Sequence, residues 1–474
     1  MKKYLIILPL FVATVFLSCS DQLDRLPVDS LVEETAYNTV EDLQFGLNGV
    51  IGSLSYNYII GFNSIFTDNT RLGVDNGGQD IGFNQQILNA DTGGFSFGGG
   101  TLWNGRYAMI NDMNRLLTAS SSISPDPADV DTYNNILAQT YAFRALAHYE
   151  LLLYYGFDMT DDSALGVPYV DYVSADATPG RNTVGEVLTG IQSDLDEALA
   201  LFPAGTTDIN FATPDFVTFL RARIALETGD NTGAIAYSNS LIADYPLASF
   251  SQYFAMFNED ADKTEVVFNF DNVQDFDYGI NFFWNFSGQG PKFEISRELF
   301  DLYTDDDIRK TVVLDDAGDD ASDLLVVGKY PINSNTLAIN DFKAMRISEI
   351  YLIRAEAYAK STQFDLAAAD VLAVQTARHI STPDAVEYNS LLEAIEGIIA
   401  ERRLELAFEG HRYTDIKRVR SITGDGIERL EDLGDCGGSV PCSLPSTSPK
   451  FILPIPSGEI NGNTVIAEQQ APGY

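Results

Sequence analysis

Regularly spaced hydrophobic residues predict that most of this chain is helical. Within residues 29–60, apolar side chains recur at intervals of three or four and fall on one helical face: Leu43, Leu47, Val50 and Leu54. The same spacing dominates from Leu102 onwards, where the first helix places Trp103 in the core on a face shared with Tyr107, Ile110 and Leu117. The pattern therefore predicts a mainly α fold.

Two segments, residues 61–101 and 271–292, interrupt the helical spacing. The first is rich in Gly, Asn and Asp, and both carry several aromatic residues, so we expect long loops, which in compact proteins are usually functional or disordered. Glu265–Phe270 is a short strand candidate just before the second segment. These features predict a loop-rich, irregular half with a minor β component.

The helical part repeats itself at unequal intervals. Three segments share an apolar-Arg-Ala-x-apolar core: Phe143–Ala147, Leu220–Ile224 and Ile353–Ala357. The second and third are followed by a polar break and a further helix rich in alanine, and small residues on one face allow neighbouring helices to approach closely. This layout predicts tetratricopeptide-like helix pairs as the scaffold; the alternative is a generic helical bundle.

The N-terminus has the pattern of an export signal. Lys2 and Lys3 precede an apolar run from Tyr4 to Leu17, which is too short for a membrane-spanning helix and ends at Ser18-Cys19. We interpret residues 1–18 as a signal peptide, Cys19 as the lipidated first residue of the mature protein and residues 19–30 as its tether. The alternative is an ordinary secretory signal in which Cys19 is incidental.

Charge narrows the choice of ligands. With 29 Lys and Arg against 68 Asp and Glu, the formal net charge is −39, which disfavours nucleic acid and anionic membrane surfaces as partners. The acidic loop Asp315–Asp323 could hold a structural calcium ion, but it lacks the spacing of an EF-hand. No cofactor and no other metal site is predicted.

Ile398–Arg420 concentrates the scarce cations of the chain. We expect a helix that ends at Gly410, with Glu401, Glu405 and Glu409 on one stripe, bridged by Arg402, Arg403 and Arg412. Because charged side chains are rarely buried unless they are paired, we interpret this segment as a structural lattice of ion pairs and not as a catalytic site.

No catalytic residue is predicted, and the chain is not expected to be an enzyme. Gly94–Gly98 matches G-x-S-x-G, but the glycines that follow it are a poor start for the helix that a nucleophile elbow requires. The three histidines sit in or beside helical motifs. Cys436 and Cys442 are expected to form a local disulfide in an exported protein; the alternative is two free thiols.

Several motifs together resemble the SusD/RagB family. They are Glu401–Arg418, Arg346–Ala357, Leu299–Tyr303 with Asp307–Arg309, the Leu453–Pro456 segment and the terminal Ala471–Tyr474. The resemblance implies a single SusD-like domain over residues 31–474. It also implies a lipoprotein at the outer face of the outer membrane, which captures oligosaccharide and passes it to a SusC-like TonB-dependent transporter. The alternatives are a RagB-like, peptide-binding lid and a helical scaffold without a small ligand.

Aromatic rings in the two loop regions favour a sugar ligand, because ring faces stack on pyranoses while neighbouring amides supply hydrogen bonds. Trp284 is the predicted anchor of the site, since its segment offers no helical face in which to bury it. The proposed ligand-binding residues are Trp284, Phe283, Phe282, Tyr278, Asn281 and Asn285, with Phe83, Phe95 and Phe97 as the facing wall.

The lipidation of Cys19 can be tested by substitution. Cys19→Ala is expected to leave the protein soluble in the periplasm or mislocalised, because the acyl chains that hold it to the membrane are attached to that residue. Membrane fractionation measures the membrane-bound share, and an unchanged share in the variant would contradict the assignment.

Overall fold

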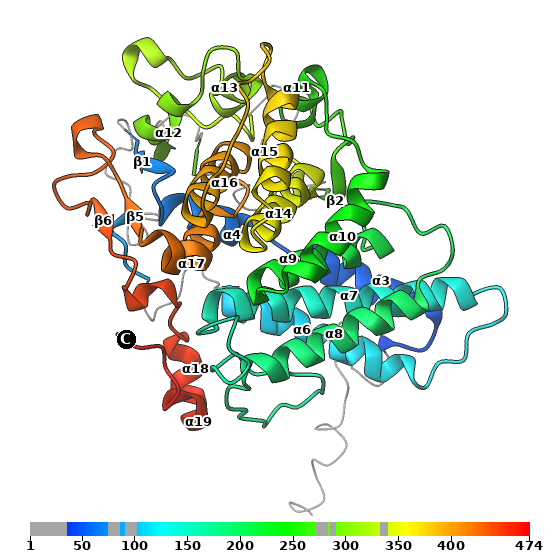
Figure 1. Cartoon of the computed structure of the whole chain (residues 1–474). Helices are drawn as coiled ribbons and strands as arrows, with labels where there is room; N and C mark the ends of the chain where they lie inside the picture. The colour runs from blue at the N-terminus through cyan, green and yellow to red at the C-terminus, as the bar shows by residue number, and fades with distance from the viewer. Residues whose placement is uncertain (1–35, 74–85, 91–101, 272–282, 285–290, 332–339) are drawn as a thin grey trace, which may run out of the picture.

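The computed structural model describes residues 36–73, 86–90, 102–271, 283–284, 291–331 and 340–474 (Figure 1). The described part is mainly helical. A stack of helices forms its centre: α7 (Val130–Tyr155), α8 (Val184–Leu201), α9 (Pro214–Thr228), α10 (Asn231–Asp244), α14 (Ile347–Lys360), α15 (Phe364–Arg378), α16 (Leu391–Glu405) and α17 (Arg412–Thr423). Successive members of this stack contact one another, which confirms the predicted tetratricopeptide-like scaffold.

The remaining helices surround this stack. They are α3 (Val40–Gly52), α4 (Asn57–Ile65), α6 (Leu102–Ser120), α11 (Phe250–Asn258), α12 (Arg297–Leu302), α13 (Ile308–Val313), α18 (Ser457–Gly462) and α19 (Thr464–Ala467). The predicted apolar face of residues 29–60 is confirmed in α3, where Leu43 and Leu47 are fully buried. None of the helices in the described ranges is long and apolar enough to cross a membrane.

The β structure is minor. Each strand pairs antiparallel with one other: β1 (Thr70–Leu72) with β3 (Phe293–Ile295), β2 (Val266–Phe270) with β4 (Phe342–Arg346), and β5 (Ile427–Glu428) with β6 (Ser443–Leu444). Strand β2 confirms the predicted strand. The expectation of loop from residue 61 onwards is wrong at its start, because α4 continues to Ile65 and β1 follows, and the side chains there are buried.

The arginines of the repeated core link neighbouring helices. Arg144 on α7 donates from Nε to Asp194 on α8 over 2.9 Å, and Arg354 on α14 donates from Nε to Asp370 on α15 over 2.9 Å. The small residues beside each arginine allow the helices to come close, and the guanidinium then bridges them. The repeated sequence therefore encodes both the packing and the ion pair of a helix pair.

The cation-rich segment differs from the prediction in where its helix ends. Helix α16 ends at Glu405 and a turn follows, with Phe408 at φ +64° and Gly410 at φ +90°. A Cβ on Gly410 would lie 2.7 Å from Ile59 Cγ2, so glycine is required there for space as well as for backbone geometry. Glu409 therefore lies in a turn and not on a helical stripe with Glu405.

The arginines of this segment also pair with other carboxylates than predicted. Residues 401, 402 and 403 are turned by about 100° from one to the next around the helix, so they face different neighbours. Arg402 pairs with Asp415 at 2.9 Å, and Arg412 pairs with Asp68 at 2.6 Å. The predicted lattice is present, but Arg402 pairs with an aspartate of the next helix and Arg412 pairs with a distant part of the chain.

Glu405 is the centre of this lattice and is fully buried. Its carboxylate accepts hydrogen bonds from Arg346 and Arg378, each over 2.9 Å, and Arg309 lies 3.3 Å away. Burial alone would raise the pKa of Glu405, but Arg378 and Arg346 outweigh that effect and hold the pKa well below its ordinary value. The carboxylate is therefore ionised in the core.

Removing the charge of Glu405 is expected to destabilise the fold. Glu405→Gln leaves buried guanidinium groups without their shared anion, and the free energy of unfolding should fall by about 3 to 5 kcal/mol. Asp305→Asn is the control, because Asp305 pairs with Lys310 at 2.6 Å but its side chain is 96% exposed, so a change of less than about 0.5 kcal/mol is expected. Urea unfolding measures both, and equal effects would contradict the assignment.

Candidate functional site

An open cavity of about 410 Å³ lies against α6, which is within the usual size range of small-molecule sites. We call it the α6 pocket. One turn-spaced face of α6 lines it, together with residues 168–179 and one residue of α18. The lining side chains are Trp103, Tyr107, Asn111, Arg115, Pro168, Val170, Tyr172, Ser174, Ala175, Ala177, Pro179 and Glu459.

Aromatic rings form the floor and the rim of the α6 pocket. Trp103 is only 2% exposed, and its ring centroid lies 4.8 Å from that of Tyr107 and 5.0 Å from that of Tyr155. Tyr172 is 42% exposed and lies at the rim. The pocket thus has one fixed aromatic surface, supported by core packing, and one aromatic ring that solvent can reach.

Hydrogen bonds from α6 hold the opposite wall, residues 168–172, in place. The hydroxyl of Tyr107 donates to the carbonyl of Pro168 over 2.8 Å. Asn114 donates from Nδ2 to the carbonyls of Val170 and Tyr172 over 3.0 and 3.1 Å. These bonds are accepted by backbone carbonyls of the wall. They therefore hold the wall backbone in position whatever side chains the wall residues carry.

His148 on α7 holds the same wall from beneath. The backbone N–H of Val170 donates to Nε2 of His148 over 3.1 Å, so that nitrogen carries no proton, and Nδ1 donates to the carbonyl of Arg144 over 3.0 Å. Burial and the neighbouring charge of Arg144 lower the pKa of His148 to about 3. A neutral histidine of a single tautomer therefore supports the wall.

Arg144 orients the asparagine of this network. It donates from Nη1 to Oδ1 of Asn114 over 2.7 Å, which directs the Nδ2 hydrogens of Asn114 towards the wall carbonyls. Its own position is set by Asp194 on α8, as described above. The repeated Arg-Ala core of α7 thus contributes to the shape of the pocket.

The C-terminal segment closes the far side of the pocket. Glu459 on α18 lines it, and Asn463 donates to the carbonyl of Pro179 over 2.7 Å. Gln469 accepts from the backbone N–H of Arg181 over 2.7 Å. Residues 168–181 are thus held between α6, α7 and the end of the chain, which makes the pocket a preformed site.

The chemistry of the α6 pocket is that of binding. Its half-buried polar side chains, Asn111, Arg115 and Glu459, stand beside aromatic rings and prolines. Arg115 and Glu459 carry opposite charges, so the lining has no net charge. Such a lining suits a ligand with apolar faces and neutral polar edges.

The structure does not place Trp284 at a ligand surface. Trp284 is fully buried and Phe283 is 2% exposed, and the Trp284 ring packs edge-on against Phe408 at 5.4 Å. The assignment of these two residues to a binding surface is wrong, because the turn after α16 offers the tryptophan an apolar partner that no helical periodicity indicates. Trp103, in contrast, is in the core as predicted.

The other predicted ligand residues lie outside the described residues, and so does Cys19. These ligand residues are Tyr278, Asn281, Phe282, Asn285, Phe83, Phe95 and Phe97. The acidic loop Asp315–Asp323 is described, and its last residue pairs with Arg71 at 3.0 Å. Within the described ranges, no group of three or more metal-ligating side chains is present.

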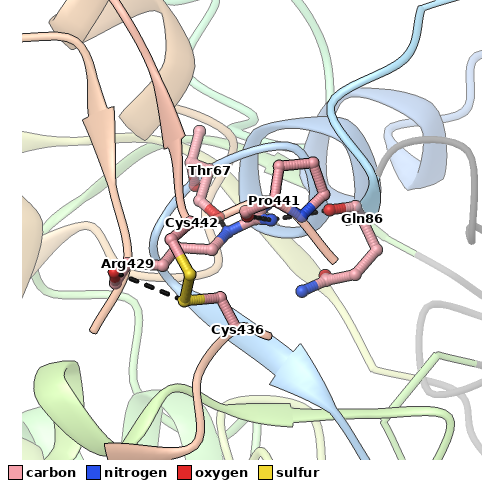
Figure 2. The surroundings of a disulfide bond; sticks show 6 residues. All are labelled: Thr67, Gln86, Arg429, Cys436, Pro441 and Cys442. Atoms are coloured by element: carbon pink, nitrogen blue, oxygen red, sulfur yellow. Dashed lines mark hydrogen bonds between the residues drawn. A yellow bond between two sulfur atoms is a disulfide. The ribbon is translucent and has the colours of Figure 1, made fainter. Parts of the chain in front are cut away.

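Cys436 and Cys442 are bonded to each other, with their Cα atoms 5.2 Å apart (Figure 2). The bond closes the hairpin of β5 and β6. Arg429 in that hairpin donates from Nε to the carbonyl of Thr67 and from Nη1 to that of Gln86, over 2.9 and 2.6 Å (Figure 2). The disulfide thereby braces a hairpin that holds the segment after α4.

The sequence of α6 contains a signal for the α6 pocket. Trp103, Tyr107, Asn111 and Arg115 recur every four residues along α6. The apolar members of this stripe predict burial, whereas its polar members predict exposure, and a stripe that changes in this way along a helix indicates a partly open face. The wall at residues 168–179 could not be placed from sequence.

Comparison with known proteins gives two family matches. A family model described as "SusD family" matches residues 326–474, and a second, described as "Starch-binding associating with outer membrane", matches residues 62–214. A full-length relative, SusD-like protein P2 of Formosa agariphila, is 26% identical over 539 aligned positions that span all of both chains.

Solved structures share the fold. A SusD superfamily protein from Bacteroides thetaiotaomicron superimposes with a TM-score of 0.77 at 22% identity, covering 92% of this chain and 100% of that one. A SusD-like carbohydrate binding protein from Bacteroides vulgatus gives a TM-score of 0.71 at 22% identity, covering 92% of this chain and 98% of that one.

The fold and the pocket define a helical-repeat protein with a preformed surface pocket. Both family matches and a relative that aligns over its whole length identify the chain as SusD-like. The family that matches residues 62–214 is described as one of starch-binding proteins associated with the outer membrane.

The neutral state of His148 predicts how stability depends on pH. The unfolded chain takes up a proton on this residue below pH 6.5, whereas the folded site resists protonation until about pH 3, so stability falls as the pH drops through that window. The loss attributable to His148 between pH 8 and pH 5 is about 2 kcal/mol.

His148→Gln keeps a donor and an acceptor but cannot be protonated. Between pH 8 and pH 5, the free energy of unfolding of this variant should therefore fall by about 2 kcal/mol less than that of the parent. His411, whose pKa burial lowers to about 4, is present in both proteins, and the difference between them isolates His148. Urea unfolding at several pH values measures it; an unaltered pH dependence would show that His148 is protonated in the folded protein.

Proposed function

We propose that this protein is a cell-surface binding lipoprotein that captures oligosaccharide or polysaccharide and delivers it to a SusC-like TonB-dependent transporter. The observation that carries the proposal is the match of residues 62–214 to a family described as starch-binding and associated with the outer membrane. The fold adds support, because similar folds include a SusD-like carbohydrate binding protein. The export signal ending at Cys19 supports a lipid anchor facing the cell exterior.

The ligand is proposed to be a neutral glycan. A chain with a formal charge of −39 repels anionic polymers at long range, whereas a neutral polymer approaches it without that penalty. The aromatic residues of the two loop regions, Phe83, Phe95, Phe97, Tyr278 and Phe282, with the amides of Asn281 and Asn285, remain the proposed glycan contacts there. Trp284 and Phe283 are not among the proposed contacts, because both side chains are buried.

The proposed role is capture without chemical change. The buried carboxylates of the cation-rich segment are committed to structural ion pairs: Glu401 and Glu405 with Arg309, and Glu409 with Arg346. Removal of one partner would leave a buried charge unpaired, which supports a structural role for these groups. Delivery then depends on release to a transporter, and the glycan should leave unmodified.

Native gels cast with separate neutral polysaccharides test this proposal. Migration of the protein is expected to slow in at least one of amylopectin, xylan, laminarin and galactomannan, and incubation with that polymer should release no reducing sugar. Serum albumin is the non-binding control. Unchanged migration in all four gels, together with calorimetric binding of a tryptic peptide mixture, would contradict glycan capture and favour the RagB-like alternative.

A further inference from the structure

We infer that the α6 pocket is a subsite for one neutral pyranose unit of a bound glycan, with Tyr172 as its stacking surface and Asn111 as its polar contact. This inference rests on the proposed function and adds a specific site to it. The site shares no residue with the loop contacts predicted from sequence. All of its lining residues are described in the structure.

The arrangement of aromatic and polar groups fits a sugar ring. A pyranose has an apolar C–H face and hydroxyl groups around its edge, so it needs a flat aromatic surface with donors and acceptors beside it. The α6 pocket supplies Tyr172 at the rim and Tyr107 on α6, and the amide of Asn111 both donates and accepts. The hydroxyl of Tyr107 is already used by Pro168, so its ring is the part that can contact a ligand.

The pocket is rigid before any ligand arrives. The backbone of residues 168–172 is hydrogen-bonded to the side chains of Tyr107, Asn114 and His148. The backbone that carries Tyr172 therefore does not have to become ordered during binding. Ordering a loop on binding would reduce affinity, and a preformed wall avoids that loss. This matters for a sugar, since each ring contributes only a few contacts.

The charges at the pocket select against acidic sugars. Arg115 offers a cation, but Glu459 stands across the same cavity, and the strongly acidic chain surrounds both. A uronic acid or a sulfated sugar would therefore meet Glu459 as well as Arg115. A neutral hexose or pentose meets no such conflict, and its hydroxyls can bond to either side chain.

Tyr172→Ala and Asn111→Ala test the subsite. Both residues lie at the surface of the pocket, and the bond from Asn114 to residue 172 uses the backbone carbonyl, which alanine retains, so folding should be unaffected. Phe254→Ala is the control, because Phe254 is 36% exposed against 42% for Tyr172 and does not line the pocket. The probes are maltoheptaose, xylohexaose, laminarihexaose, mannohexaose and an oligogalacturonate, each measured by calorimetry.

At least one neutral oligosaccharide should bind, and each pocket variant should weaken it about tenfold, the loss expected when one aromatic or polar anchor is removed, while Phe254→Ala binds as the parent does. Equal affinity in all variants would overturn the subsite and leave the proposed function standing. Binding of none of the neutral probes would overturn both. Preference for the oligogalacturonate would overturn the neutral-sugar assignment.

Tryptophan fluorescence gives a second measurement, which reports where the sugar binds. Trp103 lines the pocket and Trp284 is buried elsewhere, and the chain has no other tryptophan. In a Trp284→Phe background, the bound oligosaccharide should shift the emission of Trp103. With Tyr172→Ala added, about tenfold more sugar should be needed to reach half of that shift; emission of Trp103 that does not change at a saturating sugar concentration would place the sugar elsewhere.

Discussion

The buried carboxylate of Glu405 is the constraint on which the remaining structure depends. It lies at the end of α16 and is fully buried. A carboxyl group in that position is either ionised and surrounded by cations, or neutral at a large cost in free energy. The cations come from α13, from the end of β4 and from the end of α15. Three segments far apart in the sequence are therefore fixed relative to one helix end. The scaffold and the irregular half are joined at this point.

Buried ion pairs of the same kind also link other parts of the fold. Arg346 and Arg378 also share Glu265, which precedes β2, so the small sheet of β2 and β4 is attached to the helical stack by charge as well as by packing. Arg144 repeats the device on α7, where it bridges to α8 and orients Asn114. In one case the ion pairs build the core, and in the other they shape a surface pocket. The cations of this acidic chain are thus committed largely to architecture.

The sequence predicts the elements of this fold better than it predicts their partners. Helical spacing and the repeated Arg-Ala core were sufficient for the scaffold, because both are local properties of the chain. The partner of Arg412 was not predictable, since Asp68 is more than three hundred residues away from Arg412 and only the folded chain brings them together. The predicted position of Trp284 was wrong for a related reason. Its ring packs against Phe408, and nothing near either residue in the sequence indicates that contact.

The α6 pocket shows how a structural network can also set a recognition surface. Asn114 and His148 are buried and would be assigned to the core by any burial criterion, yet both bond to the backbone of the pocket wall. Their effect on a ligand is indirect, through the position of Tyr172. Variation of the exposed wall side chains would change which sugar fits without disturbing these bonds, because the wall residues take part in them only through main-chain atoms. A fold that separates support from contact in this way can retain its scaffold while its ligand changes.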